Sequence, residues 1–97
     1  MMECDICKKK ERTDEEKKAL LNRVNRITGQ MNGIKKMIEN DAYCPDVLIQ
    51  LSATYSAIKS LSGIILKEHM KTCVVNGIKN DDMSVIDELA NLFQKFQ

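Results

Sequence analysis

The feature that most constrains this chain is a run of apolar residues spaced alternately four and three apart. These positions are Leu20, Val24, Ile27, Met31, Ile34 and Ile38. Such spacing puts the apolar side chains on one stripe of an α-helix. Thr13, with Glu16 three residues later, predicts the N-terminal cap of this helix, and Asn40-Asp41 predicts its end. The pattern therefore indicates a first helix of roughly 26 residues.

A second long helix is predicted from Pro45, which suits a first helical turn, to about Asn76-Gly77, a C-terminal signal. Its apolar seam is Leu48, Leu51, Tyr55, Ile58, Ser62, Ile65 and His69. A further apolar file, which we expect the hairpin to leave uncovered, is Val47, Leu61, Ile64 and Leu66. Because one hairpin cannot cover two such stripes, we expect an antiparallel four-helix-bundle dimer.

A short third helix is predicted after a cap at residues 80–82. Its inward positions are Val85, Leu89, Leu92 and Phe96. The fold class is thus all-α, with helices in the order long, long, short. We expect one helical domain over residues 13–97, preceded by a flexible arm at residues 1–12 that carries Cys4 and Cys7 as a C-x-x-C pair.

Composition narrows the function classes. The chain has 97 residues, a net charge of +1, and no apolar run approaching the roughly 18 residues of a membrane helix. No secretory signal is visible, so we expect a cytoplasmic protein whose cysteines are thiols or metal ligands, with no membrane partner. Near neutrality argues against nucleic-acid binding, but residues 1–39 hold ten Lys/Arg against seven Asp/Glu and so predict one basic face.

The residues with metal-binding chemistry are Cys44, His69 and Cys73. His69 and Cys73 are four apart and share a helix face, although such a pair also occurs in proteins where it only packs. Cys44 lies 25 residues before His69, roughly 38 Å away along one helix. An antiparallel dimer would bring Cys44 of one chain to the other two residues of its partner. Two thiolates and one imidazole form a soft trigonal set that favours Cu(I).

These residues also carry a family resemblance. The stretch RVNRITGQMNGIKKMIENDAYCPDVLIQLSA, followed by LKEHMKTC and IDEL, resembles the copper-sensitive operon repressors of the CsoR/RcnR family over about residues 17–96. The resemblance implies a repressor whose dimers pair into tetramers, bind operator DNA without metal and release it on binding Cu(I), controlling copper export or resistance genes. It implies Cys44, His69 and Cys73 as ligands, with Tyr43 and Glu88 hydrogen-bonded to the ligand histidine. A copper chaperone is a further candidate partner.

Other functions fit the sequence less well. Nickel and cobalt sensors of this family use several imidazoles, whereas His69 is the single histidine. The alternative within the family is a per- or polysulfide sensor that uses Cys44 and Cys73. A thiol enzyme would need an oxyanion site and an orienting group, and no Gly-rich loop or strand-to-helix elbow supplies them, so we expect no enzyme.

The expected DNA-binding residues lie on the first helix. The resemblance assigns Arg23 to the family's Leu-Asn-Arg motif; Arg26, Lys17 and Lys18 extend the basic face. The arm cysteines Cys4 and Cys7 have no counterpart that we recognise in the family core. They are possible accessory thiols with three open interpretations: a copper-capture site, a redox pair, or two exposed thiols.

Overall fold

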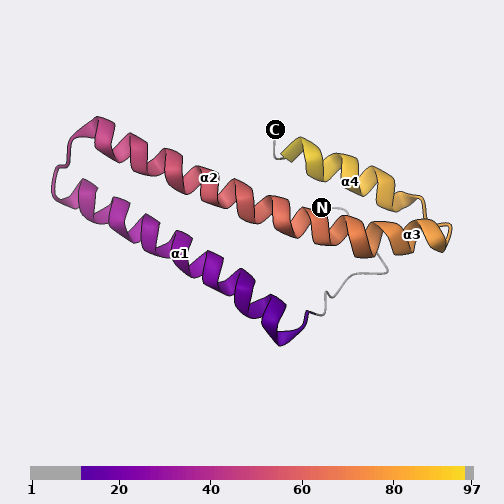
Figure 1. Ribbon diagram of the computed structural model, residues 1–97. Coiled ribbons are helices and arrows are strands. Elements are labelled where there is room, and N and C mark those ends of the chain that lie inside the picture. Colours follow the sequence, from indigo (N-terminus) through magenta and orange to yellow (C-terminus); the bar gives the residue numbers. More distant parts are fainter. Residues whose placement is uncertain (1–11, 96–97) are drawn as a thin grey trace. The chain divides into compact units, whose positions relative to one another are not determined.

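The structure is a computed structural model, and it describes residues 12–95. Residues 1–11 of the predicted arm, with Cys4 and Cys7, lie outside the described residues, and so does Phe96. Helix α1 (Asp14–Glu39) is followed by α2 (Cys44–His69), a π-helical segment η2 (Met70–Val74), α3 (Val75–Lys79) and α4 (Ser84–Lys95), as Figure 1 shows. Residues 12–95 contain no strand, which confirms the all-α prediction. None of the described helices combines the length and apolarity needed to cross a membrane.

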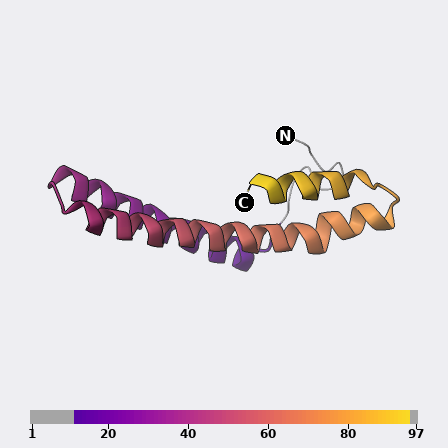
Figure 2. The same cartoon turned by 90° about the horizontal axis from the view of Figure 1, so that it is seen from above.

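The described chain divides into two compact units. One runs from Arg12 to Ser62 and the other begins at Gly63. In the first unit, α1 and the N-terminal part of α2 run side by side in opposite directions (Figures 1 and 2). In the second, α4 folds back along η2 and α3.

Helix α1 begins where its capping residue predicts. The Thr13 hydroxyl accepts a hydrogen bond from the Glu16 amide at 3.1 Å and donates to Glu16 Oε1 at 3.0 Å. Asp14, Glu15 and Glu16 place negative charge on the first turn, where the helix dipole favours it. The predicted start and the predicted stop at Asn40-Asp41 are both confirmed.

The two turns between helices have the same geometry. Asp41 (φ 54°) and Asp81 (φ 59°) both adopt the left-handed conformation directly after the residue that caps a helix. The Ala42 amide donates to Met37 O at 2.9 Å, and the Asp82 amide donates to Gly77 O at 2.7 Å. Each is the six-residue hydrogen bond of a Schellman motif, which satisfies carbonyls at the end of a helix.

The prediction for the covered face of the second helix was wrong. The expected seam is exposed at Leu48, Leu51, Tyr55, Ile58 and Ile65. The file expected to stay uncovered is instead half-buried at Val47, Leu61, Ile64 and Leu66. Both files are apolar, so hydrophobic spacing alone could not show which one this chain itself covers. The buried residues of the first unit are Ile34 and Thr54.

The prediction that the second helix ends near Asn76-Gly77 was also wrong. The helix continues through η2 and α3 to Lys79, and Asn80 caps it. Gly77 is buried within α3. A Cβ at this position would lie 2.5 Å from Val85 Cγ1 and 3.2 Å from Asp82 O. The glycine is thus required for the close approach of α4 and does not terminate a helix.

The core of the second unit consists of Cys73, Val74 and Val85, with Leu89 packed against it. Val85 is fully buried. At the start of α4, Asp82 Oδ1 accepts a hydrogen bond from the Ser84 amide at 3.2 Å. The inward positions Val85 and Leu89 and the cap within residues 80–82 are therefore confirmed. This small core fixes α4 on the segment that carries Cys73.

Candidate metal centre

The predicted metal-binding residues occupy the two ends of α2 and the segment after it. Cys44 is the first residue of α2 and His69 the last, while Cys73 lies within η2. A helix rises 1.5 Å per residue, so Cys44 and His69 of one chain are roughly 38 Å apart. Within residues 12–95, no group of three or more His, Cys, Asp or Glu side chains is arranged to hold a metal ion.

His69 and Glu88 are brought together by the return of α4. His69 Nε2 lies 3.3 Å from Glu88 Oε1. Glu88 is a buried carboxylate, and such groups rarely lie in a protein interior without a partner. His69 Nε2 is itself buried and has no hydrogen bond of good geometry within the described chain. The Nε2 side of the imidazole thus faces a buried carboxylate.

Cys73 is the most enclosed cysteine of the described chain. It is 1% exposed and belongs to the core with Val74 and Val85. Thr72 Oγ1 lies 3.8 Å from its sulfur. In the structure Cys73 takes part in a disulfide, whereas Cys44 is a free, exposed thiol. Binding of a metal by Cys73 therefore requires the reduced protein.

The backbone between His69 and Cys73 is not a regular α-helix. Residues Met70–Val74 form a π-helical turn, in which hydrogen bonds span five residues. Such turns are rare and often occur at functional sites. They have no recognised sequence signature, so sequence reasoning missed this one.

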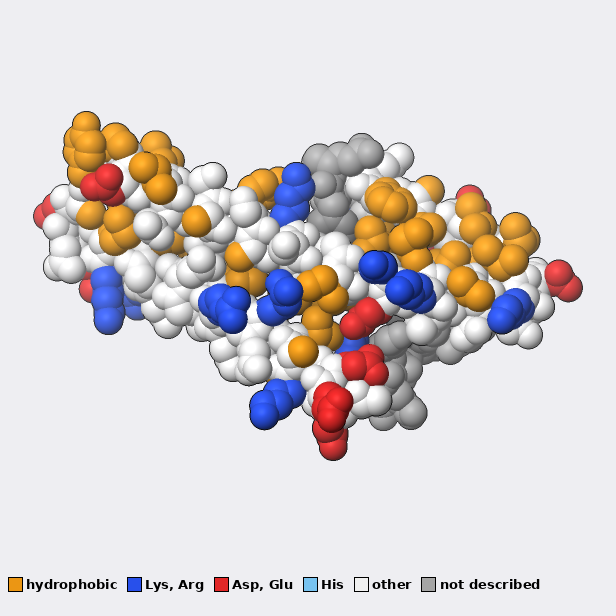
Figure 3. All heavy atoms as spheres, in the orientation of Figure 1, with side chains coloured by type: hydrophobic (Ala, Val, Ile, Leu, Met, Phe, Trp, Pro, Cys, Tyr) orange, Lys and Arg blue, Asp and Glu red, His pale blue; other side chains and the backbone are white. Residues whose placement is uncertain are grey.

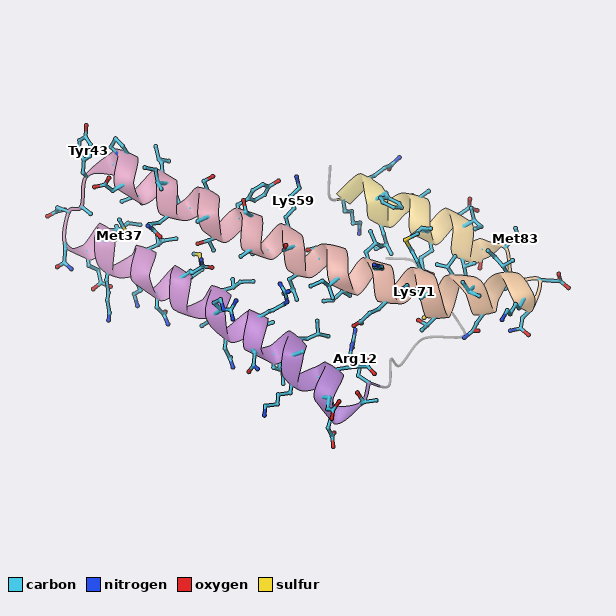
Figure 4. All side chains as sticks on the ribbon, in the orientation of Figure 1. Arg12, Met37, Tyr43, Lys59, Lys71 and Met83 are labelled. Carbon is cyan, nitrogen blue, oxygen red and sulfur yellow. The ribbon has the colours of Figure 1, made fainter. Side chains whose placement is uncertain are left out.

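Tyr43 lies at the opposite end of α2 from His69. It precedes Cys44 in the turn after α1 and points away from both helices in Figure 4. Its side chain is 71% exposed. Within the second unit, α4 brings Glu88 to the imidazole.

The predicted basic residues of α1 are exposed. Lys17, Lys18, Arg23 and Arg26 all project to solvent. Figure 3 shows Lys and Arg side chains spaced along α1, and a separate hydrophobic group over α3 and α4. The exposed apolar residues of α3, α4 and the turn between them include Val75, Ile78, Met83, Ile86 and Phe93.

Fold and site together define a helical protein with a histidine and a cysteine four residues apart, the histidine beside a buried carboxylate. Residues 16–95 match the model of the metal-sensitive transcriptional repressor family. The chain belongs to this family.

Individual relatives agree with this assignment. Over 86 residues the chain is 42% identical to the copper-sensing transcriptional repressor CsoR of Bacillus subtilis. The matched residues cover 88% of this chain and 85% of the relative. The structure matches the crystal structure of the copper-sensing repressor CsoR with Cu(I) from Geobacillus thermodenitrificans, with a TM-score of 0.85 and 32% identity over 91% of this chain and 93% of that one.

A second solved structure shows that the fold does not select the metal. The nickel-responsive transcriptional regulator InrS matches with a TM-score of 0.71 and 27% identity, over 93% of this chain and 99% of that one. Structures named for copper and for nickel thus share this architecture. Ligand type is one of the properties by which proteins of one fold can select different metals.

Proposed function

We propose that this protein is a Cu(I)-responsive transcriptional repressor, which binds operator DNA without metal and releases it when Cu(I) binds. The observation that carries the proposal is the His69–Cys73 pair at the end of α2, with Glu88 Oε1 3.3 Å from the imidazole. The copper-sensing relatives support it. In this role the protein would act in the cytoplasm on copper export or resistance genes, and a copper chaperone would be a further partner.

The donor set favours Cu(I) over nickel. Thiolate sulfur is a soft donor that selects Cu(I), whereas nickel sites of this kind rely on several imidazoles. The sequence has one histidine and four cysteines. Cys44, His69 and Cys73 would supply two thiolates and one imidazole.

The complete ligand set would come from two chains. Cys44 and His69 are too far apart on one α2, but an antiparallel dimer places the start of one α2 beside the end of the other. Exposed apolar residues of α1 and α2, among them Val24, Met31, Leu48 and Ile58, are surface that such a dimer would cover. These dimers would pair further into tetramers.

Glu88 and Tyr43 would orient the ligand imidazole. A metal-binding histidine usually donates its other ring N–H to a carboxylate, which fixes the tautomer and the ring position. With Glu88 beside Nε2, Nδ1 is the nitrogen that would bind the metal. Tyr43 would approach the same imidazole from the partner chain, next to Cys44.

Arg23, Arg26, Lys17 and Lys18 would contact operator DNA. Their exposure on α1 suits contact with phosphates, which depends on accessible cationic side chains. A tetramer would repeat this basic face and so raise the local positive charge of a nearly neutral chain.

The test is a titration of the reduced protein on fluorescent operator DNA. Cu(I), Ni(II) and a polysulfide are added in separate arms, and release is followed by anisotropy while mass spectrometry records the bound species. We expect the protein to dissociate from the DNA in the Cu(I) arm and in neither of the other two. Release by polysulfide with a Cys44–Cys73 cross-link, and not by Cu(I), would replace the proposal with the sulfur-sensing alternative.

A further inference from the structure

One side-chain hydrogen bond spans the two proposed ligands of the same chain. Thr72 Oγ1 donates to the backbone carbonyl of Glu68 at 2.8 Å. Glu68 immediately precedes His69, and Thr72 immediately precedes Cys73. The bond therefore ties the backbone just before the imidazole to the residue just before the thiol. The same hydroxyl oxygen lies 3.8 Å from Cys73 Sγ.

Two other threonines make the same kind of bond in a different setting. Thr28 donates to Val24 O and Thr54 to Gln50 O, both at 2.9 Å. Both bonds lie within α-helix, so a threonine bonded four residues back does not by itself produce a π-turn. What distinguishes Thr72 is that its bond joins the residue before His69 to a residue inside the π-helical segment Met70–Val74.

The π-turn makes this bond consequential for ligand spacing. A π-turn widens the helix by one residue and is less common than the α-helical alternative. If the segment relaxed toward α-helix, Cys73 would rotate relative to His69. The Thr72 hydroxyl restrains both ends of that movement, because it donates to the Glu68 carbonyl beside His69 and also lies 3.8 Å from Cys73 Sγ.

We propose that Thr72 is a positioning residue of the metal centre, whose bond to the Glu68 carbonyl sets the relative placement of the His69 imidazole and the Cys73 sulfur. The identity of the metal rests on the proposed function, whereas the bond joins two groups of this chain. Groups that orient a ligand without touching the metal change metal affinity on the order of 10- to 100-fold when removed.

The test compares Thr72→Val, which removes the hydroxyl at similar shape, with Thr72→Ser, which keeps it. Cu(I) affinity of the reduced protein is measured by competition with bathocuproine disulfonate, and the copper–thiolate charge-transfer band is recorded. We expect Thr72→Val to lose at least about tenfold in affinity and to shift the band. Thr72→Ser should retain both. The matched control Thr28→Val removes the same kind of bond from α1 and should change neither.

Three outcomes would overturn the proposal: wild-type affinity and band in Thr72→Val, failure of serine to rescue, or an equal loss in Thr28→Val. A readout without copper separates this inference from the proposed function. In the reduced, metal-free protein, iodoacetamide should alkylate Cys73 faster in Thr72→Val than in wild type or Thr72→Ser, with Cys44 as the internal reference. If the wild type binds no Cu(I), the proposed function fails. The role of Thr72 is judged separately by alkylation: equal rates for Cys73 in wild type and Thr72→Val would reject it. If valine prevents folding, Thr72→Ala replaces it.

Discussion

Gly77 and Val85 pack so closely that a methyl group on Gly77 would lie 2.5 Å from Val85 Cγ1 and 2.8 Å from Cγ2. Val85 is fully buried, so a shift of its methyl groups would disturb the packing around it. Gly77→Ala should therefore destabilise the protein by about 1–3 kcal/mol through overpacking, although alanine favours a helix by about 1 kcal/mol. Urea unfolding measures the change. Gly63→Ala, where an added Cβ meets nothing within 4 Å, is the control and should not destabilise; equal stability of both variants would contradict the packing argument.

Asp81 adopts a left-handed conformation that costs a residue with a side chain more than glycine. Asp81→Gly should consequently raise the free energy of unfolding by about 0.5–1 kcal/mol. Asp81→Val should lower it, because a β-branched residue tolerates positive φ poorly. Thermal unfolding followed by circular dichroism compares the three proteins. A less stable glycine variant would mean that the aspartate side chain contributes more than its backbone conformation costs.

Proposed ligands from opposite chains can be tested by complementation. Cys44→Ala and the double variant His69→Ala/Cys73→Ala should each bind Cu(I) far more weakly than wild type, since each site lacks a thiolate. A mixture of the two should form hybrid dimers with one intact site. Native mass spectrometry identifies the hybrids and their copper content. Tight binding by either parent, or none by verified hybrids, would reject the two-chain site.

Arg23 is exposed on α1, so its removal should not disturb the hairpin. Arg23→Ala should weaken operator binding by about 1–3 kcal/mol if the side chain contacts a base edge. If it contacts only phosphate, the loss should be similar across DNA sequences and the salt dependence should flatten. Anisotropy at several salt concentrations distinguishes these cases, with unchanged Cu(I) affinity as the control. Normal DNA affinity would move the binding face elsewhere.

Glu88 should matter for transmitting copper binding more than for binding itself. Glu88→Gln keeps the shape but removes the charge beside His69 Nε2. Two thiolates still bind Cu(I), so His69→Ala and Glu88→Gln should retain much of the affinity while requiring more copper to release DNA. A ligand shifts a conformational equilibrium only through contacts that differ between the two states. If either variant dissociated from operator DNA at the copper concentration that releases the wild type, transmission through His69 and Glu88 would be excluded.

The parts of the fold that could be predicted depend on local signals. Thr13 and Asn40-Asp41 bound α1 because caps and turns act over a few residues. The role of Gly77 could not be predicted, because it depends on Val85 returning from a later helix. The covered face of α2 was likewise ambiguous, since apolar residues occupy two of its faces.

The same distinction applies to the candidate site. The spacing of His69 and Cys73 is visible in the sequence, and so is their separation from Cys44. The approach of Glu88 to His69 depends on the turn at Asp81 and on α4 packing against Cys73 and Val74. Spacing alone does not contain this tertiary information, and family resemblance was the only sequence signal for Glu88.

The location of Cys44 at the first residue of α2 and His69 at its last has a consequence for the protein as a sensor in dilute solution. If each site needs two chains, copper affinity falls once the protein is diluted below its own dimer dissociation constant. Copper in turn stabilises the dimer by mass action. The cellular amount of the protein would then set its copper threshold, and a cell could adjust its sensitivity by changing expression alone.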